Sequence, residues 1–135
     1  MSDESKVIEG VGFAVAPDLD ALGEGYGFRK LRTQLGVTAF GVNVITIPPG
    51  YETGSHYHDE QEELYFVHRG AIEISFGDGS AHRLEQGGSA RVDASTVRKI
   101  ANGSTAEDAV YLVVGGKDGY VGRDGRVPEA DETAS

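Results

Sequence analysis

Residues 50–70, GYETGSHYHDEQEELYFVHRG, combine a His-x-His pair with a run of acidic residues and a strand-like segment. His56 and His58 are two residues apart, so on a β-strand both side chains point to the same face. Two imidazoles on one face can bind a divalent metal ion together. This stretch therefore predicts a metal site that is built on strands.

A carboxylate that could complete this site is Glu63, five residues after His58. On one straight strand this odd offset would place the two side chains on opposite faces, but the polar residues 59–61 allow the chain to turn. If Glu63 begins the next strand, its carboxylate can face back toward the histidines. Two histidines and one carboxylate form the facial triad that suits Fe(II), Mn(II) and similar ions, with open positions for a substrate or oxygen.

Other side chains compete for the same role. Glu60 and Glu62 are rival carboxylates that we expect to be solvated, with Glu62 as the second choice of ligand. Alternation along the strand places His68 on the face opposite Glu63, where we expect a structural role. His82 could reach the site as a replacement ligand.

The rest of the chain is dominated by short strand-like segments, and glycine and proline leave few windows that are long enough for a helix. We expect one short helix at 17–22 and a hairpin turn at 77–80, where Asp-Gly favours a tight turn. Such a series predicts an all-β sandwich or barrel. The expected strands are 11–15, 28–32, 40–47, 63–69, 71–76, 81–84, 89–92, 97–101 and 109–114.

The composition limits the classes of function. A chain of 135 residues suits one domain, and the absence of cysteine excludes disulfides, thiolate zinc sites and a cysteine nucleophile. With 22 acidic and 12 basic residues, the net charge of −10 disfavours nucleic-acid binding. There is neither an apolar run of about 18 residues nor a signal-peptide pattern, so we expect a cytoplasmic protein without membrane contact.

Gly50, His56, His58, Glu63 and Gly70 follow the pattern Gly-x5-His-x-His-x4-Glu-x6-Gly. This pattern resembles the first motif of the cupin superfamily at every fixed position. The resemblance implies a cupin-type jelly-roll barrel, also called a double-stranded β-helix. It also implies a divalent metal on the two histidines and the glutamate, with Fe, Mn, Ni, Co and Zn as the candidates.

The same resemblance divides the chain into parts. It implies a single cupin domain with its core at about residues 40–114. The segment 1–39 then forms a short N-terminal extension, and the segment 115–135 forms a loose C-terminal tail. Small cupins commonly dimerise, so the resemblance implies a homodimer, in which the extension could add a strand to the partner's sheet.

The second cupin motif, Gly-x5-Pro-x-Gly-x2-His-x3-Asn, is degenerate in this chain. Alignment on Gly87 and Asn102 places Arg98 where the family has its fourth metal-binding histidine, and alignment on Gly88 places Lys99 there. We prefer Arg98 because the asparagine then matches. A guanidinium has no lone pair for a metal. At about 5 Å from a divalent ion, in an effective dielectric of about 20, it would repel the ion by roughly 6–7 kcal/mol before screening.

Two functions follow from this substitution. In the first, the protein is a metal-dependent enzyme of the dioxygenase or isomerase type, and Arg98 binds a small anionic substrate. In the second, the protein is a metal-free or non-catalytic module that binds or senses a small molecule, and Arg98 pairs with Glu63.

Three tyrosines near the motif, Tyr51, Tyr57 and Tyr65, could line a pocket or donate protons, although packing is the competing interpretation. We assign Tyr65 to substrate binding together with Arg98. The sequence does not identify the substrate, the reaction or a catalytic residue.

Overall fold

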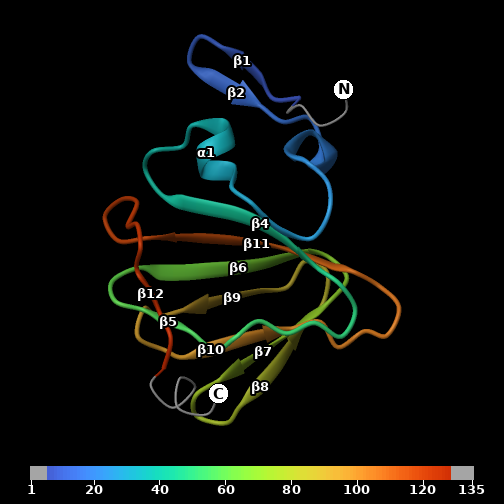
Figure 1. Cartoon of the computed structure of the whole chain (residues 1–135). Helices are drawn as coiled ribbons and strands as arrows, with labels where there is room; N and C mark the ends of the chain where they lie inside the picture. The colour runs from blue at the N-terminus through green and yellow to red at the C-terminus, as the bar shows by residue number, and fades with distance from the viewer. Residues whose placement is uncertain (1–5, 129–135) are drawn as a thin grey trace.

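Two antiparallel sheets form the body of the protein (Figure 1). The computed structural model of the chain describes residues 6–128. The larger sheet has the strand order β3-β4-β11-β6-β9, with β3 at Gly27–Arg29, β4 at Gly41–Ile47, β6 at Glu62–Arg69, β9 at Ser89–Val92 and β11 at Ala109–Gly116. The smaller has the order β10-β7-β8, with β7 at Ile72–Phe76, β8 at Ala81–Leu84 and β10 at Arg98–Ala101. The all-β prediction is confirmed.

Smaller elements surround the two sheets. In Figure 1 the hairpin of β1 and β2 projects away from the body, whereas β5 and β12 lie at one end of the strands. These elements are β1 (Ile8–Gly10), β2 (Phe13–Val15), a 3-10 helix (Leu19–Leu22), α1 (Leu31–Leu35), β5 (Tyr57–His58) and β12 (Gly125–Arg126). Within residues 6–128, no helix is long and apolar enough to cross a membrane.

The hydrophobic core lies between the two sheets. Along β6, Glu63, Tyr65 and Val67 are buried, while the residues between them are exposed, because successive side chains of a strand alternate between its faces. The buried face packs on side chains from the smaller sheet, including Ile74 and Ile100. This alternation turns Glu63 toward the interior, as the sequence predicted.

Two expected strands are wrong in part. The strand predicted at 28–32 ends at Arg29, and a helix begins at Leu31. Arg29 is buried there because its guanidinium donates to the carbonyls of Gly23 and Gly25, contacts that no strand pattern reveals. The strand predicted at 11–15 begins only at Phe13, because residues 11–12 form the turn after β1.

The predicted turns agree better with the structure. The helix expected at 17–22 is a 3-10 turn whose N-cap, Asp18, accepts a hydrogen bond from the backbone of Ala21 at 2.9 Å. The hairpin at 77–80 joins β7 to β8 as expected. Gly70, the last residue of the first motif, has φ +76°, and a Cβ there would lie 2.6 Å from the carbonyl oxygen of Asp108. Only glycine fits this turn.

Candidate metal centre

The structure brings His56, His58 and Glu63 together, with one candidate ligand atom from each residue lying within 4.8 Å of the others. His56 is held opposite Arg98 by two backbone hydrogen bonds of 2.9 Å. His58 lies two residues further on, in β5, and Glu63 is the second residue of β6. The bend at residues 59–61 reverses the chain between β5 and β6, which is how the odd spacing still places the carboxylate beside the imidazoles.

The two oxygens of Glu63 have different surroundings. Oε1 accepts hydrogen bonds from the Tyr65 hydroxyl at 2.7 Å and from Nη2 of Arg98 at 3.3 Å. Oε2 lies 3.3 Å from Nε2 of His58. Burial alone would raise the pKa of this carboxyl, but the hydrogen bonds and charges of His58, Tyr65 and Arg98 lower the pKa below its usual value. The group is therefore ionised at neutral pH, and Oε2 faces the histidines.

His58 presents an unused nitrogen to the same space. Its Nε2 is buried and has no hydrogen-bond partner. On the other side of the ring, Nδ1 accepts a hydrogen bond from the side-chain amide nitrogen of Gln61 at 3.0 Å and lies 3.8 Å from Oδ2 of Asp124. In metal-binding histidines the second ring nitrogen commonly donates to a carboxylate or a carbonyl, and the Asp124 carboxylate lies on this side of the ring for that role. With Nδ1 protonated in this way, the lone pair of Nε2 would face the Glu63 carboxylate and be available to an ion.

Asp124 comes from the C-terminal segment, which crosses this end of the molecule (Figure 1). Its buried carboxylate accepts hydrogen bonds from the backbone N–H groups of Glu60 at 2.9 Å and Gln61 at 2.8 Å. Burial alone would raise the pKa of Asp124, but these bonds lower it. Strand β12 then pairs with β5. The described part of the expected loose tail, 115–128, is thus fixed against the site.

Arg98 points inward and is fully buried, whereas the side chain of Lys99 is 38% exposed and pairs with Glu52. The alignment that places Arg98 at the missing histidine therefore agrees with the structure. Its Nη1 donates to the carbonyl of Thr96 at 2.6 Å and its Nη2 to Glu63. Nε has no partner. The contact with Glu63 is the one that the metal-free interpretation requires.

A cavity of about 500 Å³ opens beside the histidines. Of the residues singled out in the sequence, Tyr51 and Tyr65 line it with the three candidate ligands, whereas Arg98 lies behind Glu63 and does not. Tyr57, Glu60, Glu62, His68 and His82 are also absent from its walls. The lining residues are Phe28, Asn43, Ile45, Tyr51, Thr53, Gly54, Ser55, His56, His58, Gln61, Glu63, Tyr65, Ile100, Tyr111, Val113 and Val127.

Two phenols in this cavity are kept protonated. Burial and the nearby charge of Glu63 raise the pKa of Tyr65 well above its usual value. Burial, with smaller effects of Glu63 and Tyr51, also raises the pKa of Tyr111. At neutral pH the Tyr65 hydroxyl donates to Glu63, whereas the Tyr111 hydroxyl can donate a hydrogen bond into the cavity. Tyr111, Gln61 and Asp124 were not predicted from the sequence as members of the site, and only the alternation of β11 could have indicated that Tyr111 faces inward.

The half-buried position of His56 predicts a pH-dependent stability. Burial, and secondly the charge of Arg98, lower the pKa of His56 below 6.5. Near and below pH 6.5 the unfolded chain therefore binds a proton that the folded chain does not, so the free energy of unfolding falls as the pH decreases through this window. Urea denaturation between pH 7.5 and 5.5, with a chelator present, measures this fall.

In His56→Gln the fall is expected to be shallower, because the titrating group is gone. His82→Gln, which changes an exposed histidine on β8, serves as the matched control and should keep the wild-type slope. Equal slopes for wild type and His56→Gln would contradict the prediction.

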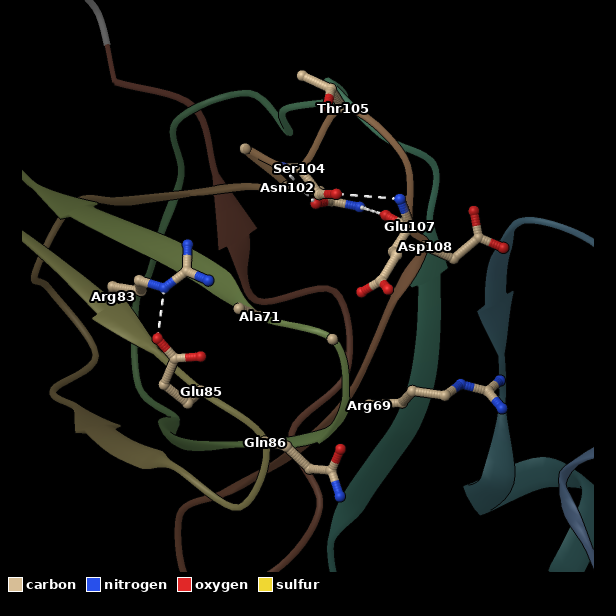
Figure 2. A pocket seen from close by; sticks show the side chains of 12 residues that line it. Arg69, Ala71, Arg83, Glu85, Gln86, Asn102, Ser104, Thr105, Glu107 and Asp108 are labelled. Atoms are coloured by element: carbon tan, nitrogen blue, oxygen red, sulfur yellow. Dashed lines mark hydrogen bonds and ion pairs between the residues drawn. The ribbon is translucent and has the colours of Figure 1, made fainter.

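A second hollow, of about 990 Å³, lies between the β6–β7 turn, the end of β8 and the loop after β10, and Figure 2 shows its side chains. Several of its polar groups are engaged with one another or with the backbone. Arg83 pairs with Glu85, and the Asn102 amide donates to the carbonyls of Ile47 at 3.1 Å and Glu107 at 2.9 Å. None of its described lining residues has a buried polar atom without a partner. Asn102, the last residue of the second motif, therefore fixes a loop.

Comparison with known proteins links this geometry to a family. The sequence matches the cupin domain over residues 43–115, which is more than half of the chain. No curated protein sequence matches the chain. The structure is similar to that of a sugar phosphate isomerase from a cupin superfamily of Silicibacter pomeroyi DSS-3, with 31% identity, a TM-score of 0.62, and coverage of 78% of this chain and 68% of that chain.

Two further structures extend the comparison. A cupin protein from Bacteroides fragilis is 25% identical, with a TM-score of 0.62 and coverage of 84% of this chain and 92% of that chain. The polyketide cyclase RemF from Streptomyces resistomycificus is 23% identical, with a TM-score of 0.58, and the chain spans 62% of its length and matches it over 65% of its own. At this identity RemF supports the fold alone. The predicted jelly-roll fold is confirmed by these likenesses.

Proposed function

The chain belongs to the cupin domain family, and from this premise we propose that it binds one divalent metal ion through His56, His58 and Glu63. In this proposal the metal-loaded protein is an enzyme of the isomerase or dioxygenase type. Its substrate is a small molecule with an anionic oxygen group. The observation that carries the proposal is the convergence of the three candidate ligands around a buried nitrogen that has no partner.

The residues present fit such an ion. Neutral imidazoles are required as ligands, and the lowered pKa of His56 keeps that ring neutral at physiological pH. Glu63 offers Oε2 while Tyr65 and Arg98 hold Oε1. A bound divalent ion would act as a Lewis acid that polarises a carbonyl, or as a centre for oxygen chemistry. Iron, manganese, nickel, cobalt and zinc all remain candidates.

The remaining side chains would position the substrate. The Tyr111 phenol is protonated at neutral pH and lines the cavity, so it can donate a hydrogen bond to a substrate oxygen. The Tyr65 hydroxyl already donates to Glu63, so toward a substrate it can only accept. The positive charge of Arg98 lies behind Glu63 and offsets part of the negative charge at the metal end. The isomerase type is supported by the 31% identical sugar phosphate isomerase.

One contact favours a second candidate function. Nη2 of Arg98 lies 3.3 Å from Oε1 of Glu63, so the carboxylate already has a cationic partner without a metal. In that case the protein would be a non-catalytic module that binds or senses a small molecule in the same cavity.

The homodimer inferred from the resemblance stays a prediction. Exposed apolar side chains on β6, Leu64 and Phe66, and on the projecting hairpin, Ile8 and Phe13, offer surfaces for a second copy. The cytoplasmic location also stays a prediction.

A titration of chelator-treated protein with Mn²⁺ tests the proposed function. We expect one ion per chain by electron paramagnetic resonance of the free ion, and an affinity at least about tenfold weaker in Glu63→Gln, because a ligand charge is lost. Glu62→Gln is the matched control, because Glu62 is the neighbour of Glu63 on the exposed face of β6 and its substitution removes the same charge. Binding far below one ion per chain, or an equal loss in both variants, would favour the metal-free module.

A further inference from the structure

The walls of the cavity specify a substrate class. We propose that the substrate carries its only charged group at the metal and is otherwise uncharged and largely apolar, so that a phosphorylated sugar is excluded. This inference rests on the proposed metal-dependent function and sharpens it. It separates this chain from its 31% identical neighbour, which is described as a sugar phosphate isomerase.

The first observation is the absence of a cation from the cavity. Among the described residues that line it there is no lysine and no arginine, and the one carboxylate is Glu63. A phosphate dianion that leaves water needs charged donors to replace its hydration, and arginine or lysine commonly supplies them. Nothing in these walls supplies such donors away from the metal end. A second anionic group would therefore enter unpaired.

The second observation concerns the cations around the cavity. Arg123 lines a neighbouring hollow that shares Gln61 and Glu63 with the cavity, but it is not among the lining residues of the cavity itself. The other nearby cations are engaged in contacts of their own. Arg98 is fully buried and donates to Glu63 and to backbone carbonyls, so it cannot turn into the cavity without losing these contacts. Lys99 pairs with Glu52 on the outside of β10. Arg126, next to the lining residue Val127, pairs with the carboxylate of Asp59. The net charge of −10 adds no attraction for a dianion.

The third observation is what the walls offer instead. Ile45, Ile100 and Val113 form an apolar surface, and Phe28 and Tyr51 add aromatic rings. Such surfaces favour the burial of hydrocarbon or aromatic groups. The volume of about 500 Å³ suits a small organic molecule. A compound with a 2-oxo carboxylate at one end and an apolar body at the other has this chemistry.

The experiment compares three probes on Mn²⁺-loaded protein by isothermal titration calorimetry. Phenylpyruvate has a 2-oxo carboxylate, which can chelate the metal ion, and an aromatic body. Pyruvate has the 2-oxo carboxylate without the aromatic body. Glucose 6-phosphate has a polar body and carries its phosphate at the end of the sugar away from the carbonyl carbon. We expect phenylpyruvate to bind at least about tenfold more tightly than either of the others, because only its body buries apolar area. Glucose 6-phosphate binding as tightly as phenylpyruvate would overturn the inference.

A pair of variants tests the role of charge directly. Val127→Arg adds a cation at the rim of the cavity, at a side chain that is 53% exposed. Val11→Arg adds the same charge at a fully exposed turn outside the cavity. We expect only Val127→Arg to bind glucose 6-phosphate more tightly than wild type, by at least about fivefold, since a new charged donor can reach the phosphate. Equal binding by both variants would overturn the inference.

The two proposals fail in different ways. The Mn²⁺ stoichiometry is measured before any probe is added. A chain that binds no Mn²⁺ overturns the proposed function and this inference with it. A chain that binds one Mn²⁺ but prefers glucose 6-phosphate overturns the substrate class alone.

Discussion

A chain in which alanine replaces His58 is expected to lose stoichiometric metal binding. Nε2 of His58 is buried and lies 3.3 Å from the Glu63 carboxylate, so the alanine variant lacks one of the three candidate ligand atoms. Changes to the outer partners of metal ligands already weaken affinity by about 10–100-fold, and loss of a ligand should cost at least about 100-fold. Metal content after purification and Mn²⁺ titration measure the effect, and His56→Ala should behave alike.

His68→Ala is the matched control for this prediction. His68 lies on the exposed face of β6 and outside the cavity, so its removal should leave metal binding unchanged. His58→Gln keeps more of the side-chain volume beside Gln61 and guards against an effect of misfolding. Metal binding that survives in both His58 variants would exclude the proposed centre.

Replacement of Arg98 should have the second large effect. Its guanidinium is fully buried, and Arg98→Met would leave Glu63 without its cationic partner in the absence of metal. Breaking a buried ion pair from one side costs about 3–5 kcal/mol of unfolding free energy. Urea denaturation with a chelator present measures this loss.

The adjacent cation provides the control. Lys99→Met removes an exposed ion pair with Glu52 and should change stability by less than about 1 kcal/mol. A similar, small change in both variants would show that the Arg98–Glu63 contact contributes little to stability.

A histidine at position 98 is expected to strengthen the binding of a metal ion. Arg98→His removes a positive charge beside the site and restores the fourth ligand type of the family. Because a guanidinium near a divalent ion is repulsive, we expect Mn²⁺ to bind at least about tenfold more tightly. A weaker affinity in Arg98→His would mean that Arg98 serves metal binding through its hold on Glu63.

Local patterns explain how much of the fold could be predicted. The seven-residue strand Gly41–Ile47 and the alternation along β6 were predicted within one residue, because β-branched and alternating residues report burial directly. The segment 28–32 was predicted wrongly, because the carbonyls of Gly23 and Gly25, in the turn just before it, bury Arg29 and the residues after it form a short helix. Propensity alone does not encode such contacts.

The candidate site likewise contains residues that the sequence predicted and residues that it did not. His56, His58 and Glu63 were predicted from fixed spacings along one segment. Gln61 lies in the same segment, but it was treated as part of a polar bend. Asp124 accepts a hydrogen bond from the backbone of Glu60, 64 residues away in the chain, and no local pattern reveals this contact.

The sequence by itself determined the β class, the inward face of β6, and the three side chains that could hold a metal ion. These properties depend on the two-residue period of a strand and on one local bend, which neighbouring residues control. Only the tertiary structure decided that Arg98 holds Glu63 from behind, that the C-terminal segment fixes the loop beside His58, and that no lysine or arginine lines the cavity within residues 6–128. Such properties arise where strands far apart in the chain meet, and no spacing within a single segment specifies them.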